Sequence, residues 1–135
     1  MNHVHFEISQ KFFFDAAHTL NREIEADSSR RIHGHTYYAE ATVSGQPDPL
    51  TGMVVDLGFV RLAIEQLRPQ LDHRMLDDVA GLGPATLENL CAFIWRALLP
   101  SLPQLSSVRV WRDSIGDSCT LRARPVSSVV TAALK

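Results

Sequence analysis

The chain contains 135 residues, 45% of them hydrophobic and 21% charged, with a formal net charge of -2 at pH 7. These values predict a single globular domain over residues 1–135. They argue against nucleic-acid or membrane binding, because the sequence has neither a basic run nor an apolar stretch of membrane-spanning length. The N-terminus lacks the pattern of a secretory signal, and Cys91 and Cys119 lie in a predicted helix and a predicted strand. We therefore expect a cytoplasmic protein without a disulfide framework.

The first part of the chain predicts two strands joined by a polar loop. Hydrophobic and polar residues alternate over about His5–Phe14, and again over about Gly34–Ser44, as expected for strands with one buried face. The segment Asn21–Arg31 between them is rich in charged residues and serines, which is typical of an exposed loop.

Two amphipathic helices are expected next. Asp56 is a suitable N-cap for a helix over about Leu57–Leu71, whose apolar residues recur at helical spacing. Thr86 is a suitable N-cap for a second helix that continues to Leu99, where Pro100 ends it.

Two final strands, near Ser107–Arg112 and Ser118–Arg124, complete the order ββααββ, and a short tail follows. This order predicts an α+β fold, in which a four-stranded antiparallel sheet carries both helices on one face. The other face and the two sheet edges would then be exposed, so we expect several copies to assemble through their sheets.

Three histidines in the two N-terminal strands indicate a metal site. Within Ile32-His33-Gly34-His35, the two histidines are two residues apart and therefore point to the same side of a strand. A third imidazole from a neighbouring strand would complete the set, and His18 lies upstream in Phe14-Asp15-Ala16-Ala17-His18. Three neutral imidazoles suit zinc and leave its fourth position for water or substrate, as in catalytic zinc sites.

Five segments, in their order and spacing, resemble the 6-pyruvoyl-tetrahydropterin synthase and 6-carboxy-tetrahydropterin synthase family of T-fold proteins. They are Phe14-Asp15-Ala16-Ala17-His18, Ile32-His33-Gly34-His35, Gly52-Met53-Val54-Val55-Asp56, Leu71-Asp72-His73 and Pro84-Ala85-Thr86-Leu87-Glu88-Asn89-Leu90. The resemblance extends from Phe12 to about Leu121, which is nearly the whole chain.

This resemblance implies a T-fold enzyme that binds Zn²⁺ through His18, His33 and His35. The implied substrate is 7,8-dihydroneopterin triphosphate, and the implied product in bacteria is 6-carboxy-tetrahydropterin, on the route to queuosine and other deazapurines. The family forms trimers that stack into hexamers, so the sheets would join into an oligomeric barrel with active sites between subunits.

Asp72 and His73 match the family's acid–base pair. Histidine both accepts and donates protons near neutral pH, which suits a proton shuttle beside a Lewis-acidic metal. The two residues are expected at the end of the first helix. Because they are adjacent in sequence, we expect them to act through a third group rather than to bond to each other.

The position of the family's usual catalytic cysteine, four residues before His33, is occupied by Ser29. A serine hydroxyl is much less acidic than a thiol and needs a base to activate it. Glu25 and Asp27 lie in the same loop, and some paralogues use a glutamate instead of the cysteine. Those paralogues cleave dihydroneopterin derivatives to 6-hydroxymethyl-dihydropterin, which gives a second interpretation of the activity.

The family's pterin-binding glutamate is replaced by Arg112. Arginine has only hydrogen-bond donors and cannot reproduce the two bonds that a carboxylate accepts from a pterin. Asp113 is a candidate replacement if a bulge turns it, Glu88 is another, and Thr86 belongs to the same substrate-binding segment. Arg112 would instead hold a phosphate, a carbonyl or a structural carboxylate.

Two further interpretations remain open. The triphosphate has candidate partners in Arg22, Arg30 and Arg31, which lie near the predicted metal in the sequence. The loss of both the cysteine and the glutamate also favours a paralogue that binds zinc and a pterin without catalysis, whereas the retained histidines and Asp72 favour an enzyme.

Overall fold

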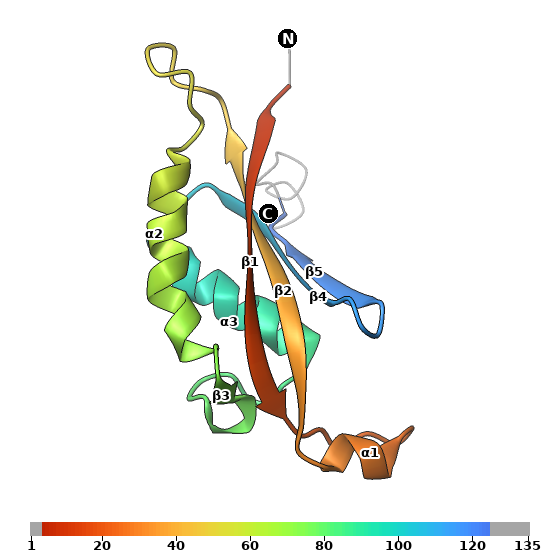
Figure 1. Cartoon of the computed structure of the whole chain (residues 1–135). Coiled ribbons are helices and arrows are strands. Elements are labelled where there is room, and N and C mark those ends of the chain that lie inside the picture. The colour runs from red at the N-terminus through yellow and green to blue at the C-terminus, as the bar shows by residue number, and fades with distance from the viewer. Residues whose placement is uncertain (1–3, 125–135) are drawn as a thin grey trace, which may run out of the picture.

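The computed structural model describes residues 4–124 of the chain. Its strands form one sheet in the order β3-β1-β2-β4-β5 (Figure 1). The strands are β1 (Phe6–His18), β2 (His33–Gly45), β3 (Arg74–Met75), β4 (Leu105–Arg112) and β5 (Asp117–Arg122). The helices are α1 (Ala26–Arg30), α2 (Leu57–Leu67) and α3 (Leu87–Leu98), with short 3-10 turns η1 (Arg68–Gln70) and η2 (Leu76–Asp78).

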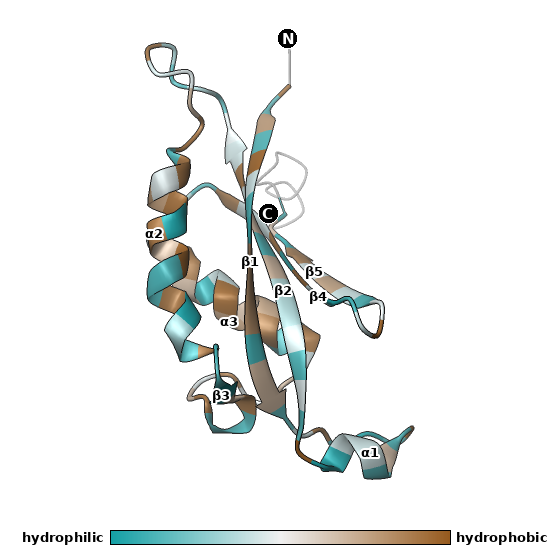
Figure 2. Ribbon diagram, in the orientation of Figure 1, coloured by the Kyte–Doolittle hydropathy of each residue, from teal (hydrophilic) through white to brown (hydrophobic). Residues whose placement is uncertain are grey.

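The hydrophobic core lies between one face of the sheet and the two long helices, α2 and α3 (Figure 1). Alternate residues of β1 and β2, such as Phe14 and Tyr37, point into this core and are fully buried. Hydrophobic residues are also prominent in α3, whereas α1 is mainly hydrophilic (Figure 2). The predicted α+β architecture with both helices on one face is therefore confirmed.

The two N-terminal strands are longer than the sequence pattern predicts. β1 continues beyond Phe14 to His18, because residues 15–18 pair in register with the start of β2. The polar segment between these strands is not a continuous loop, since it contains the short helix α1. The extension of β1 matters because it brings His18 next to β2.

The two long helices begin where their caps predict. The Asp56 side chain accepts a hydrogen bond from the Gly58 backbone N–H at 2.8 Å, and the Thr86 side chain accepts one from the Asn89 N–H at 3.1 Å. However, α2 ends at Leu67 rather than Leu71. Pro69 lacks a backbone N–H and its ring interferes with the preceding helical turn, so the chain continues as a 3-10 turn.

The predicted antiparallel strands are present as β1-β2-β4-β5, but the sheet also contains a fifth strand, β3, which runs parallel to β1. β3 has two residues, too few for a hydrophobic repeat to reveal it. Both C-terminal strands also begin earlier than predicted, at Leu105 and Asp117. Gly116, with φ of 87°, closes the turn between β4 and β5.

Two remaining expectations concern membranes and the tail. None of the helices within residues 4–124 is long and apolar enough to cross a membrane. The predicted C-terminal tail after residue 124 lies outside the described residues.

Candidate metal centre

The structure brings His18, His33 and His35 together at one end of the sheet. His18 and His33 are register partners across β1 and β2, and His35 points to the same face two residues further along β2. One ring nitrogen from each of the three histidines lies within 4.8 Å of the others. The ring centroids are 4.5–4.9 Å apart. This triangle of imidazoles is the arrangement that a single metal ion needs.

Backbone carbonyl groups orient two of the three rings. His18 Nδ1 lies 2.9 Å from the carbonyl oxygen of Ala85, and His33 Nδ1 lies 2.7 Å from that of Arg31. A carbonyl oxygen can only accept, so each Nδ1 carries the proton and each Nε2 keeps its lone pair. Metal-binding histidines characteristically donate such a hydrogen bond from the ring nitrogen that does not bind the metal. The donor set therefore fits a divalent metal such as zinc.

Burial favours the neutral form of His18 and His35. His18 is almost fully buried, and burial lowers its pKa below the usual 6.5. Burial, together with the nearby positive charge of Arg112, lowers the pKa of His35 to about 4. A neutral imidazole is the form that coordinates a metal, so the site is ready for a cation near neutral pH.

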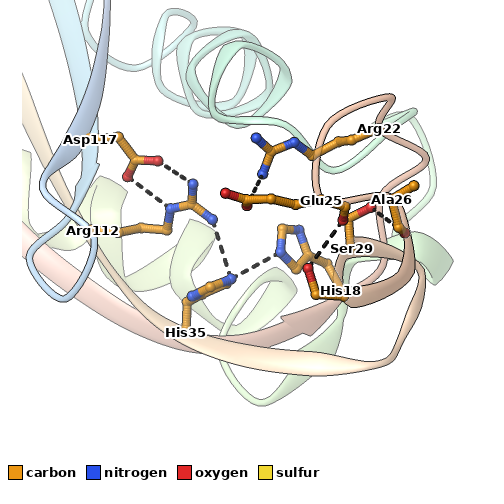
Figure 3. Close-up of polar contacts among 9 residues, drawn as sticks. His18, Arg22, Glu25, Ala26, Ser29, His35, Arg112 and Asp117 are labelled. Carbon is orange, nitrogen blue, oxygen red and sulfur yellow. Dashed lines mark hydrogen bonds and ion pairs between the residues drawn. The ribbon is translucent and has the colours of Figure 1, made fainter.

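Arg112 and Asp117 form an ion pair beside the histidines (Figure 3). They are register partners in β4 and β5, and the Arg112 Nε donates to Asp117 Oδ1 at 3.0 Å while Nη2 donates to Oδ2. The third nitrogen, Nη1, lies 3.2 Å from His35 Nε2. The ion pair raises the pKa of Arg112 and lowers that of Asp117. The guanidinium is thus a fixed positive charge at the edge of the candidate metal centre.

Ser29 and Glu25 line a cavity of about 350 Å³ together with His33 and His35. Ser29 is buried, and its hydroxyl donates a hydrogen bond to the Ala26 carbonyl at 2.9 Å. The Glu25 side chain extends towards Arg112 in Figure 3 and pairs with Arg22 at 3.3 Å. The structure therefore places a serine hydroxyl and a carboxylate on the same cavity as two of the candidate metal ligands.

A neighbouring cavity of about 450 Å³ lies between the metal centre and the start of α3. Its walls include His18, Tyr37 and the ion pair on one side. The substrate-binding candidates Thr86 and Glu88 line the other side. Its volume is within the range of small-molecule sites, and it offers both aromatic and charged walls.

Asp72 and His73 bond directly to each other, which differs from the expectation that a third group would join them. His73 Nδ1 is 2.8 Å from Asp72 Oδ2. The left-handed conformation of His73, with φ of 58°, turns its side chain back towards the preceding residue. Asp72 also accepts the backbone N–H of Asp15, and these hydrogen bonds lower its pKa.

His73 lies on a different cavity from Ser29. His73 lines a cavity of about 540 Å³ with Asp15 and His35. The Asp72–His73 pair also does not end a helix as predicted, since it follows the 3-10 turn η1. Within one chain, His35 is therefore the residue that borders both the Ser29 cavity and the His73 cavity.

Several other predicted candidates lie further from the metal centre. Asp113 is exposed in the turn between β4 and β5, and Asp27 is exposed on α1. Arg30 lines a separate cavity with Thr19 and Pro84. Among the described residues, sequence reasoning missed Asp117, which the β4–β5 register could have indicated, and the Ala85 carbonyl, for which the sequence carries no signal.

The fold and the histidine cluster together define an α+β protein of the T-fold class with a candidate metal centre. The family model for 6-pyruvoyl tetrahydropterin synthase matches residues 7–124. The chain therefore belongs to this family, whose members are lyases of pterin biosynthesis.

Similar proteins agree with this assignment. The chain is 32% identical over 123 residues to a Synechocystis 6-carboxy-5,6,7,8-tetrahydropterin synthase, covering 87% of this chain and 90% of that one. A 6-pyruvoyl tetrahydrobiopterin synthase of Poecilia reticulata is 43% identical over 75 residues, and this match covers 53% of the chain and 51% of the relative, about half its length. The solved Caenorhabditis elegans 6-pyruvoyl tetrahydropterin synthase has the same fold, with a TM-score of 0.76, 23% identity and coverage of 90% and 97%.

Proposed function

We propose that the protein is a zinc-dependent lyase that converts 7,8-dihydroneopterin triphosphate to 6-carboxy-tetrahydropterin in the cytoplasm. This product would enter the route to queuosine and other deazapurines. The observation that carries the proposal is the triangle of His18, His33 and His35 in a chain of this family. The similarity to a 6-carboxy-5,6,7,8-tetrahydropterin synthase over 87% of the chain supports the choice of product.

The three histidines would hold the zinc ion through their Nε2 atoms. Zinc bound to these histidines supplies Lewis acidity for the removal of a proton from carbon. The protein's contribution is to orient the rings of His18 and His33 through the Ala85 and Arg31 carbonyls. Imidazole ligands also accept other divalent ions, so the metal content itself must be measured.

Asp72 and His73 would move the protons. Asp72 accepts from His73 Nδ1, which leaves His73 Nε2 free to take a proton from substrate and return it. The bond from the Asp15 backbone N–H holds Asp72 in place, and the side chain of His73 is 80% exposed and can reach a bound molecule. These contacts support a role for the pair as an oriented proton shuttle.

The pterin ring would occupy the cavity formed by Thr86, Glu88, Arg112 and the start of α3. Glu88 supplies a carboxylate that can accept N–H bonds, as the family's usual glutamate does. Arg112 and Asp117 present donors and an acceptor on the same wall. Arg22, which lines both this cavity and the Ser29 cavity, is placed to meet a phosphate group.

An alternative reaction, cleavage of dihydroneopterin derivatives to 6-hydroxymethyl-dihydropterin, is favoured by one observation. Glu25 lines the cavity that contains Ser29, His33 and His35, so a carboxylate is available where the family usually has a thiol. In this alternative, Glu25 is the base, and Ser29 is a hydrogen-bonding residue. Asp27, on the exposed side of α1, is the less suitable of the two acidic candidates.

We also propose a homo-oligomer, a trimer or hexamer, with active sites between subunits. The face of the sheet opposite the helices carries large side chains, including Phe13, which is 47% exposed, and the stacked rings of Tyr38 and Trp111. The placement of His73 and Ser29 on different cavities supports a site that a second subunit completes. Native mass spectrometry measures the oligomeric state, and a monomer would contradict the proposed oligomer.

The function is tested by incubating the zinc-loaded protein with 7,8-dihydroneopterin triphosphate and identifying products by mass spectrometry. A 6-carboxy product supports the main proposal, and a 6-hydroxymethyl product supports the alternative. A Glu25→Gln variant should lose activity only in the alternative, with Asp27→Asn as the matched control. If the zinc-bound oligomer gives no product, the paralogue that binds zinc and a pterin without catalysis is supported instead.

A further inference from the structure

Arg112 is held at the metal centre by a bidentate ion pair. Two of its three guanidinium nitrogens donate to Asp117, so the third, Nη1, has a fixed direction. Nη1 lies 3.2 Å from His35 Nε2, the same ring nitrogen that would bind the metal. The Arg112 side chain is 11% exposed, and water therefore screens its charge weakly.

A metal ion bound to His35 would change both the hydrogen bonding and the electrostatic environment of Arg112. His35 Nε2 lies 3.1 Å from His18 Nε2 as well as 3.2 Å from Arg112 Nη1, and once it binds a metal it offers no acceptor to the Nη1 N–H of Arg112. Two positive groups would also lie side by side in a partly buried place, which is unfavourable unless a negative group lies between them. Both consequences are relieved by an oxyanion, which can bind the metal and accept from Arg112 at once.

The other charges around this cavity do not supply that anion. Arg112 is paired with Asp117, and Arg22 is paired with Glu25 at 3.3 Å. The charges of these four lining residues therefore cancel one another. Binding of a divalent metal leaves two positive charges without a counterpart. The cavity beside His33 and His35 has about 350 Å³, which is enough for a small anionic group.

We propose that Arg112 is a specificity-determining residue that selects a ligand carrying an oxyanion, a carboxylate or a phosphate, next to the metal. Metal and oxyanion then bind cooperatively, each increasing the affinity of the other. This inference rests on the metal site of the proposed function and adds the chemical class of the ligand group that faces Arg112.

The test measures the affinity of the metal-free protein for Co²⁺ from its visible absorption, in a buffer with a weakly coordinating anion. Acetate and methylphosphonate are the two oxyanion probes, and acetamide is the uncharged analogue of acetate. We expect a saturating oxyanion to tighten Co²⁺ binding by about fivefold or more, as is usual for coupled sites, while acetamide changes it by less than about twofold. The oxyanion that increases Co²⁺ affinity more shows whether the ligand group is a carboxylate or a phosphate.

Two variants separate the role of Arg112 from the metal's own attraction for anions. Arg112→Gln should reduce the oxyanion effect to less than about twofold. The double variant Arg112→Glu with Asp117→Arg keeps an ion pair but reverses the charge at His35, so it should bind Co²⁺ more tightly without any anion. Arg109→Gln is the matched control, because Arg109 lies on the same strand, over the ring of Trp111, and three positions from Arg112. In Arg109→Gln, an oxyanion should tighten Co²⁺ binding as much as it does in the unchanged protein.

The inference fails if the unchanged protein shows no oxyanion effect, or if Arg112→Gln shows the same effect as the unchanged protein. This readout does not depend on turnover. A cooperative metal–oxyanion site without product formation would leave the inference intact and overturn the proposed reaction. Turnover of 7,8-dihydroneopterin triphosphate without cooperativity would do the reverse.

Discussion

His18 and His33 face each other as register partners across β1 and β2, with ring centroids 4.5 Å apart. Their positions are therefore set by the hydrogen-bonding ladder of the sheet rather than by a flexible loop. A site built on strands holds its ligands more precisely than a site built on loops. This rigidity leads to a direct prediction for metal binding.

His33→Ala should remove metal binding without unfolding the protein. We expect the unchanged protein to retain about one zinc per chain and the variant to retain much less, because two imidazoles cannot satisfy a tetrahedral site. Metal analysis after dialysis measures this, and circular dichroism checks the fold. His73→Ala is the control and should keep its metal. Equal zinc contents in His33→Ala and the unchanged protein would contradict the assignment of the ligands.

The cap of α3 should influence the metal centre as well as the helix. Thr86 caps the helix one residue after Ala85, whose carbonyl orients His18. Thr86→Ala should therefore lower the free energy of unfolding by about 1 kcal/mol and also weaken metal binding. Asp56→Ala removes the cap of α2 and is the matched control, since it should cost similar stability and leave metal affinity unchanged. Thr86→Ser should restore both properties.

The pairing of His33 and His35 was predictable from sequence because it depends on one simple rule, whereas the assignment of His18 came from the family resemblance. Side chains two residues apart on a strand share a face, so His33 and His35 had to point together once β2 was recognised. The helix caps at Asp56 and Thr86 were equally predictable, because a cap depends on residues that are close in sequence.

Other parts of the site depend on features that the sequence pattern does not reveal. The Arg112–Asp117 ion pair depends on the exact register of the β4–β5 hairpin. The last strand was predicted to start at Ser118, one residue after Asp117, so the pairing of Asp117 with Arg112 could not be inferred. The bond between Asp72 and His73 requires the left-handed conformation of His73, which non-glycine residues rarely adopt. These contacts follow from turn geometry, and hydrophobic periodicity carries no information about it.

The stability of the metal-free protein should decrease as the pH falls from about 6.5 to about 4. Unfolding would raise the pKa of His35 from about 4 to its ordinary value of 6.5, so in this range the unfolded chain binds more protons than the folded one. Stability must therefore rise with pH. Urea denaturation at several pH values measures the slope, and His35→Gln should make it shallower.

His18, whose pKa burial also lowers, contributes in the same direction, and one control variant separates the effect from that of exposed histidines. His5, near the start of β1, has an exposed side chain, and His5→Gln should leave the slope unchanged. Asp72 and Asp117 have pKa values lowered below 3.8 by their hydrogen bonds, so their stabilising contribution is lost only at more acidic pH. A slope that His35→Gln does not alter would show that another group controls stability in this range.

Asp72→Asn should reduce the turnover rate strongly while leaving metal binding intact. The asparagine oxygen can still accept from the Asp15 N–H, but the loss of negative charge removes the support for a protonated His73. Because general acid–base groups act mainly in the transition state, we expect kcat to fall by about 10²–10⁴-fold, with a much smaller change in KM.

Steady-state kinetics and zinc analysis on the same preparations distinguish this role from a structural one. Asp78→Asn, a substitution of an exposed carboxylate in η2, is the matched control and should retain full activity. A fall in kcat together with loss of zinc would instead assign Asp72 to holding the 72–75 segment against β1.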